Sequence, residues 1–207
     1  MILAAMADAV RTPIGPGARL PTRRTLDERL FVRWPGAYGA LARVGNRLPP
    51  RSRLRRAVLR RAALSGWGAW ARGDFGLMLV RFAPDYHFEP PREWLAAGMR
   101  NVYRGHAGLR EWTADMREAW ERIDHTPIEV VDAGDVVVVL SQLRLRARGS
   151  GIELNSRVGF VFWSERGLVV RERDFSDWDE ALRVAGIDAA AVGSPGRQRL
   201  TSPPSLQ

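Results

Sequence analysis

Two short segments of this 207-residue chain carry ionisable side chains at alternating positions. His87 and Glu89 lie two residues apart in the segment Tyr86–Glu89, and Glu172 and Asp174 lie two residues apart in Leu168–Phe175. Side chains at positions i and i+2 of a β-strand point to the same face. Each pair could therefore serve as a general acid and base, and His87 with Glu89 could also contribute to a metal site.

A metal site would need a third ligand, and the sequence does not supply an obvious one. The other two histidines, His106 and His125, fall at the ends of a predicted helix. The chain contains no cysteine, which excludes thiolate ligands and thiolate catalysis, and no lysine, which excludes a Schiff base. We expect no metal and no cofactor.

The segment YRGHAGL, residues 103–109, introduces the helix between the two candidate pairs. Gly105 permits a tight backbone path, and His106 stands where the helix begins, so its ring is expected to cap a backbone amide. Tyr103 and Arg104 could edge the mouth of a pocket.

The positive charge is concentrated at the front of the chain. Residues 1–73 contain 15 arginines and 3 acidic residues, whereas the whole chain has a net charge of +9. Because the basic part lies ahead of the predicted core, the charge does not indicate a nucleic-acid binder. Apolar residues at helical spacing between 26 and 48 predict a basic amphipathic helix. Such a helix could contact an anionic membrane, although docking onto its own domain or a second subunit is the favoured interpretation.

The elements that would position the candidate pairs alternate between helical and strand-like patterns. Apolar stripes predict helices over Ser52–Arg72, Asp74–Phe82 and Ala107–Asp124, and a short helix over Asp179–Ala185. Strands are expected at Tyr86–Glu89, Ile128–Asp132, Asp135–Arg148, Ile152–Ser164 and Leu168–Phe175, the last three joined by tight turns. This order predicts an α+β fold, in which three N-terminal helices pack on a curved antiparallel sheet.

Three stretches together resemble the SnoaL-like domains of the nuclear transport factor 2-like superfamily. The first two stretches are AWARGDFGLMLVRFAPDYHFEPP and YRGHAGLREWTADMREAWERI, and the third begins with IEVVDAGDVVVVLSQLRLRARG. The similarity as a whole extends from Ser52 to Ile187. The resemblance implies a cone-shaped α+β barrel with an internal pocket, and frequent homodimers. The superfamily includes polyketide cyclases, ketosteroid isomerases and limonene epoxide hydrolases, so the fold does not select one reaction.

The motifs of two relatives are only partly present. The base carboxylate of ketosteroid isomerases would fall on Pro90, beside Glu89, and the Arg-x-Asp pair of limonene epoxide hydrolases would fall on Leu143 and Leu145. The ending RERDFSD resembles that of the hydrolases and matches their acidic residue to Asp174. Alternation then places Val170, Glu172 and Asp174 toward the cavity. The alternative rotates this strand by one residue, so that Asp174 pairs in solvent with an arginine such as Arg144.

The pocket lining implied by the resemblance is rich in aromatic side chains. We expect it to comprise Trp67, Trp70, Phe88, Tyr103, Trp112, Met116, Trp120, Ser141, Leu143, Leu145, Phe160 and Phe162. Such a pocket suits a small apolar or polycyclic molecule. The chain would then be an isomerase, cyclase, lyase or epoxide-type hydrolase that works by acid–base chemistry. The alternatives are a non-catalytic small-molecule-binding module and a dimeric scaffold.

The predicted organisation has three parts. Residues 1–50 form a basic extension, disordered over 1–25 and helical over 26–48; residues 51–188 form the SnoaL-like domain; and residues 189–207 form a flexible tail. A homodimer is expected to form through the outer face of the sheet, where Val161 and Trp163 would lie. The absence of cysteine and of a secretion signal favours the cytoplasm.

Overall fold

Seven strands form one curved sheet in the computed structural model, which describes residues 9–15 and 17–188. Along the sheet the strands lie in the order β1-β4-β5-β6-β7-β2-β3. Their bounds are β1 Val10–Pro13, β2 Phe82–Glu89, β3 Tyr103–Arg104, β4 Trp120–Asp132, β5 Val136–Ala147, β6 Glu153–Glu165 and β7 Leu168–Phe175. Neighbouring strands are antiparallel except for β2 and β7, which run parallel. The predicted α+β class, with helices on a mainly antiparallel sheet, is confirmed.

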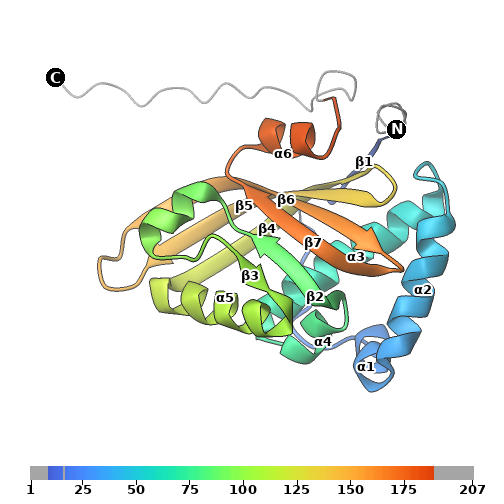
Figure 1. Ribbon diagram of the computed structural model, residues 1–207, viewed down its shortest axis with the longest axis horizontal. Coiled ribbons are helices and arrows are strands. Elements are labelled where there is room, and N and C mark those ends of the chain that lie inside the picture. The colour runs from blue at the N-terminus through green and yellow to red at the C-terminus, as the bar shows by residue number, and fades with distance from the viewer. Residues whose placement is uncertain (1–8, 16, 189–207) are drawn as a thin grey trace.

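The helices divide between the two faces of this sheet (Figure 1). Helices α3, α4 and α5 lie on one face, α6 lies on the other, and α1 and α2 stand together at one end. Their bounds are α1 Leu26–Arg33, α2 Pro35–Arg47, α3 Arg53–Arg72, α4 Phe75–Leu79, α5 Gly105–Ala119 and α6 Trp178–Val184, with a 3-10 helix at Arg92–Ala97. The concave face toward α3 and α5 therefore becomes the interior of the cone.

Local signals in the sequence explain where several helices begin and end. The side chains of Ser52, Asp74 and Asp177 accept hydrogen bonds from the first turns of α3, α4 and α6. Gly73 ends α3 with a φ of 67°, a left-handed conformation in which glycine is favoured. The caps of α3 and α4 fix the short connection that leads the chain from α3 into β2.

The helix that follows Gly105 is shorter than its apolar pattern predicts. Helix α5 ends at Ala119, and Trp120 begins β4, which pairs with β5 as far as Asp132. Trp120 and Ile123 fit the spacing of a helix, but pairing with β5 satisfies the backbone of this segment. Long-range pairing has therefore overridden a local pattern, as it often does.

The front of the described chain is more ordered than expected. Residues 10–13, predicted to be disordered, form β1 against β4, and Ile14 is buried in the main core. Residues 26–47 are helical, as expected, but in two pieces, because Trp34 precedes Pro35 and leaves the helical conformation. Residues 1–8 and the predicted tail, 189–207, lie outside the described residues.

Apolar side chains are buried on both faces of the sheet. The main core lies between the sheet and helices α3 to α5, and a second cluster lies under α6, where Val161 packs with Ala181 and Leu182. Val161 and Trp163 lie on this outer face, as predicted, but both pack in the cluster under α6, and Val161 is fully buried there. The homodimer itself stays a prediction. In the described part of the chain no helix is long and apolar enough to span a bilayer.

Candidate functional site

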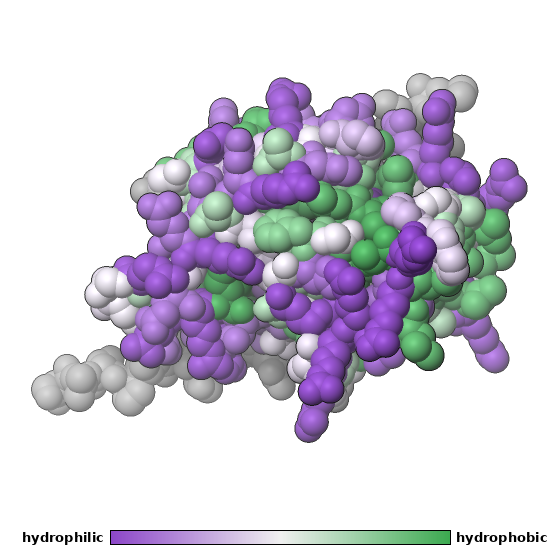
Figure 2. Space-filling view, turned by 90° about the horizontal axis from the view of Figure 1, so that it is seen from below, coloured by the Kyte–Doolittle hydropathy of each residue, from purple (hydrophilic) through white to green (hydrophobic). Residues whose placement is uncertain are grey.

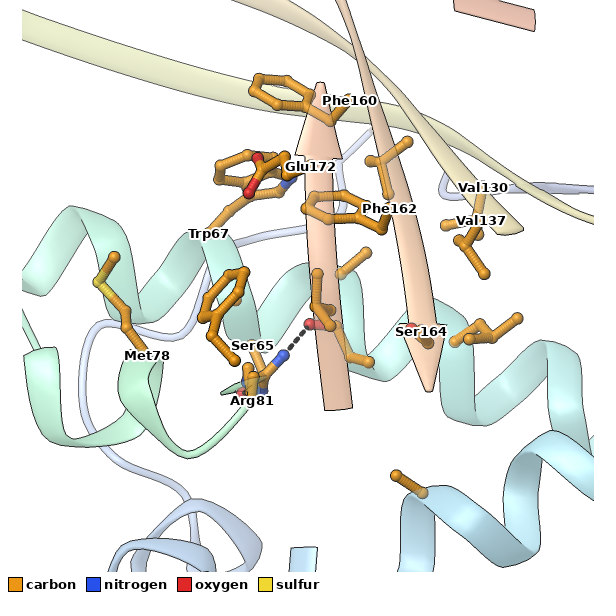
Figure 3. A pocket seen from close by; sticks show the side chains of 18 of the residues that line it. Ser65, Trp67, Met78, Arg81, Val130, Val137, Phe160, Phe162, Ser164 and Glu172 are labelled. Carbon is orange, nitrogen blue, oxygen red and sulfur yellow. Dashed lines mark hydrogen bonds between the residues drawn. The ribbon is translucent and has the colours of Figure 1, made fainter. Parts of the chain in front are cut away.

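A cavity of about 510 Å³ occupies the interior of the cone, between the helices and the concave face of the sheet (Figure 3). Most of the wall is apolar and aromatic. Seven of the twelve side chains predicted to line a pocket do so: Trp67, Trp70, Phe88, Trp112, Met116, Phe160 and Phe162. They come from α3, β2, α5 and β6, so distant parts of the sequence build one wall.

The other five predicted lining residues are not part of the cavity wall. Trp120, Ser141, Leu143 and Leu145 are buried but do not line the cavity, and Trp120 and the two leucines belong to the main core. Tyr103 is also buried, and its hydroxyl donates a hydrogen bond to Asp115 at 2.6 Å. The strand that carries Ser141 reaches the cavity through Val137 and Val139 instead.

Two carboxyl groups enter the apolar cavity from β7. Glu172 and Asp174 both line the cavity, with 7% and 5% of their surfaces exposed. Figure 3 shows the Glu172 carboxyl near Trp67 and Phe160. The inward alternation predicted for these two residues therefore agrees with the geometry. Val170 differs, because an irregularity between β6 and β7 brings Val169 to the cavity in its place.

Burial changes the protonation of this carboxyl pair. It raises the pKa of Glu172 to about 7, although hydrogen bonds with Tyr86 and Asp174 act in the opposite direction. Burial, together with the neighbouring Glu172 charge, raises the pKa of Asp174 well above its ordinary value. Ionising both of two adjacent carboxyl groups in an apolar site is energetically unfavourable, because the charges are desolvated and repel each other. The pair therefore retains at least one proton near neutral pH.

Tyr86 completes a hydrogen-bonded group around the pair. Its hydroxyl donates to Glu172, and burial followed by the Glu172 charge raises its pKa well above the ordinary value. Tyr86 consequently stays protonated. Oδ1 of Asp174 has no hydrogen-bond partner among the described atoms. A buried acceptor or donor without a partner costs free energy unless a ligand satisfies it.

His125 is a site residue that the sequence analysis missed. It lies on β4, lines the cavity and stacks on Trp67 with ring centroids 4.3 Å apart. Burial lowers its pKa to about 3, so the imidazole is neutral. Its Nδ1 has no partner among the described atoms. The predicted helix was extended through Asp124, which hid the strand alternation that points His125 inward.

His87, by contrast, lies on the outer side of β2 and does not line the cavity. It contacts Glu89 at 3.3 Å and Arg104 at 3.1 Å. Partial burial would raise the pKa of Glu89, but a hydrogen bond from Arg171 and the charge of Arg173 hold it below its ordinary value. The strand alternation that turns Phe88 and Tyr86 inward turns His87 and Glu89 outward. The prediction of His87 as a catalytic group is therefore not supported by its position.

His106 also has a different contact from the one expected. Its Nε2 lies 3.0 Å from the carbonyl oxygen of Phe82, so it links the start of α5 to β2. Among the described residues, no group of three or more His, Cys, Asp or Glu side chains could hold a metal ion.

The opposite end of the cavity includes residues from the basic extension. Phe31 of α1 and Tyr38 and Leu41 of α2 contribute to its wall. Arg81 donates a hydrogen bond to Ser65 at 2.7 Å on the same side (Figure 3). The cavity thus runs from the buried carboxyl pair toward the two added helices. Their part in the wall depends on tertiary packing, whereas the sequence pattern indicates only that this segment is an amphipathic helix.

Comparisons with known proteins agree with this architecture. The model of the SnoaL-like domain family matches residues 65–172. An NTF2-like protein of unknown function from Burkholderia pseudomallei is 22% identical, with a TM-score of 0.52 over 60% of this chain and 95% of its own. TerC, crystallised with polyporic acid, is 21% identical, with a TM-score of 0.52 over 60% of this chain and 95% of its own. A search of the curated proteins gave no match.

Proposed function

The chain belongs to the SnoaL-like domain family, and from this premise we propose that it binds a small apolar or polycyclic molecule and transfers a proton on it. The observation that carries the proposal is the buried pair Glu172 and Asp174 in an otherwise apolar cavity. A carboxyl pair of this kind is a means of holding both an acid and a base at neutral pH.

The two carboxyl groups have separate roles in this proposal. Glu172, whose pKa lies near 7, is the base that removes a proton from a carbon next to a ligand carbonyl. Asp174 stays protonated, and when the ligand is bound its O–H exchanges the hydrogen bond with Glu172 for one to the carbonyl oxygen, where negative charge develops. Glu172 then delivers the proton to another carbon, which gives isomerisation, or exchanges it with solvent and delivers a deuteron to the original carbon, which gives hydrogen–deuterium exchange. Tyr86 holds the Glu172 carboxyl in place.

The walls of the cavity support the same ligand class. Trp67, Trp112 and Phe160 offer flat apolar surfaces on which rings can stack, and neutral His125 adds a hydrogen-bonding edge without a charge. Polyporic acid, the compound crystallised with TerC, is a reasonable first ligand to test for binding. Tryptophan fluorescence would report binding, because Trp67, Trp70 and Trp112 all line the cavity.

The catalytic part can be tested without knowing the natural substrate. 1-Tetralone is a bicyclic ketone whose C–H groups beside the carbonyl exchange with D₂O, and proton NMR measures the rate. The protein should accelerate this exchange, and Glu172→Gln and Asp174→Asn should each reduce the acceleration by about 100-fold or more. Glu89→Gln, on the outer side of β2, should keep the full rate.

The possible results separate catalysis from binding. Equal exchange rates in the three variants and the unmodified protein would remove the carboxyl pair from the mechanism. If polyporic acid or 1-tetralone binds but exchange is not accelerated, the chain is a small-molecule-binding module. If neither compound changes the tryptophan fluorescence, the proposed ligand class is wrong.

A further inference from the structure

A second, polar hollow adjoins the outer end of the cavity. Its volume is about 270 Å³, and it is lined by residues of α2, the β4–β5 turn and the β6–β7 turn. Asn46, Ser164 and Gly167 line both spaces, so the hollow continues from the apolar cavity. The proposed function uses only the inner end, where Glu172 and Asp174 lie.

Three arginines give this hollow its charge. Arg43 and Arg47 are one turn apart on α2, and Arg166 faces them from the β6–β7 turn. In the described part of the chain none of the three has an ion pair with a carboxylate. Asp135 is the one acidic residue of the lining. The hollow therefore carries a net positive charge and has guanidinium groups available for a ligand.

The backbone at Arg166 favours a role for its side chain. Arg166 has a φ of 51° and Gly167 a φ of 83°, which is the pattern of a two-residue hairpin turn with both residues left-handed. Asn, Asp or Gly normally occupies the first position of such a turn, since arginine there is strained. The chain thus keeps a guanidinium at the hollow at a cost in backbone energy.

We infer that the ligand is an amphipathic anion, whose apolar body fills the cavity and whose carboxylate or phosphate binds Arg43, Arg47 and Arg166. This inference rests on the proposed function, because it extends the ligand of that same cavity. Arginine is suited to both anions through paired hydrogen bonds. Arg43 and Arg47 lie before residue 65, where the family match begins, so the added helices supply this specificity.

The length of the cavity sets the size of the ligand. Asp174 pairs with Phe160 on β6, and Ser164, at the hollow, lies four residues further along that strand. Four residues of a strand span roughly 13 Å. A body of three or four fused rings with a short side arm covers this distance.

1-Pyrenebutyrate and 1-pyrenebutanol provide a matched pair of probes. They share the apolar body and differ in the terminal carboxylate, and pyrene fluorescence measures both dissociation constants. The unmodified protein should bind the carboxylate about tenfold more tightly than the alcohol, as expected for a charge-assisted contact. Arg43→Gln combined with Arg47→Gln should remove this preference and leave the binding of the alcohol unchanged.

Further variants test the same contact in both directions. Arg166→Asn removes a charge and suits the turn, so it should weaken binding of the carboxylate without harm to folding. Asp135→Asn removes the negative charge of the lining and should strengthen binding of the carboxylate probe. Arg29→Gln with Arg33→Gln removes two charges from α1, where neither residue lines the hollow, and should keep the full preference.

Three results would overturn the inference. Equal affinities of the two probes for the unmodified protein would show that no anion site exists, while the proposed apolar site would stand. Failure of both probes to bind would count against both proposals. If Arg43→Gln with Arg47→Gln reduces sedimentation with phosphatidylglycerol vesicles but leaves the preference between probes unchanged, the arginines bind a membrane surface.

Discussion

At the scale of the residue, two acidic groups on neighbouring strands have opposite pKa shifts. Burial raises the pKa of Glu172 to about 7, from an ordinary value of 4.5. Glu89, on the outer side of β2, has its pKa lowered by Arg171 and Arg173 despite partial burial. A shifted pKa links protonation to folding, so the two groups should give opposite dependences of stability on pH.

The free energy of unfolding should fall as pH rises from about 4.5 to about 7 because of the buried pair. In this window the folded protein binds more protons than the unfolded chain does, so raising the pH favours unfolding. Glu172→Gln combined with Asp174→Asn should flatten this part of the profile. Denaturant unfolding at several pH values measures it.

Glu89→Gln is the control for this measurement. In the unmodified protein the lowered pKa of Glu89 contributes stability that is present above the ordinary pKa of glutamate and is lost as pH falls. Replacing the Glu89 carboxylate with an amide should therefore lower the free energy of unfolding more at neutral pH than at acidic pH. Parallel profiles for the unmodified protein and the Glu172/Asp174 double variant would contradict the assignment of the raised pKa values.

At the scale of the element, α2 lies directly against the β6–β7 turn. A Cβ added at Gly167 would lie 2.8 Å from the carbonyl oxygen of Gly39 and 2.9 Å from the backbone nitrogen of Arg43. Leu41 and Val44 of the same helix are exposed, and Figure 2 shows apolar atoms at the edge of the molecule where α1 and α2 lie. The helix is thus held at one side by a backbone contact.

Gly167→Ala should displace α2 and expose it to protease. Gly149 is the matched control, since it has a φ of 87° in another hairpin turn and no atom within 4 Å of an added Cβ. The left-handed backbone costs about 1 kcal/mol in both variants, and Gly167→Ala adds a clash. Trypsin should cleave after Arg43 or Arg47 faster in Gly167→Ala than in Gly149→Ala. Equal rates would mean that this contact does not hold α2.

The sequence predicted the elements better than it predicted the site. Alternation on β7 placed Glu172 and Asp174 correctly because a strand exposes every second residue, but it misplaced Val170, since an irregularity in pairing leaves no mark in the pattern. His125 was missed because Trp120 and Ile123 fit a helix as well as a strand. The contribution of α2 to the cavity and hollow depends on docking, which no local pattern encodes.

At the scale of the whole molecule, Arg55 of α3 joins the basic extension to the sheet. It is 2% exposed and makes two hydrogen bonds to Asp132 at the end of β4, at 2.6 and 2.8 Å. It also donates to the carbonyl oxygens of Asn46 and Leu48, at 2.8 and 2.9 Å. One guanidinium thus connects the end of α2, the start of α3 and the β4–β5 turn.

Arg55→Met should destabilise the molecule by about 3 to 5 kcal/mol, because it leaves the buried Asp132 carboxylate without its partner. Arg122→Met is the control, since Arg122 and Asp124 form an exposed pair and its removal should cost less than about 1 kcal/mol. Urea unfolding measures both. Similar losses in the two variants would show that the buried pair does not hold the extension to the sheet.

The parallel pairing of β2 with β7 has a consequence for how the protein reaches its native state. Tyr86 and Glu172 are 86 residues apart in sequence, and they meet only when these two strands pair. Contacts of such high sequence separation are costly to close and form late during folding. A partly folded chain with the meander β4–β7 in place carries both carboxyl groups on β7, but it lacks Tyr86 of β2, which holds the Glu172 carboxyl. A ligand that binds only when Tyr86 and Glu172 are in contact therefore stabilises the fully folded state and not the partly folded one. Binding of such a ligand reports that folding is complete.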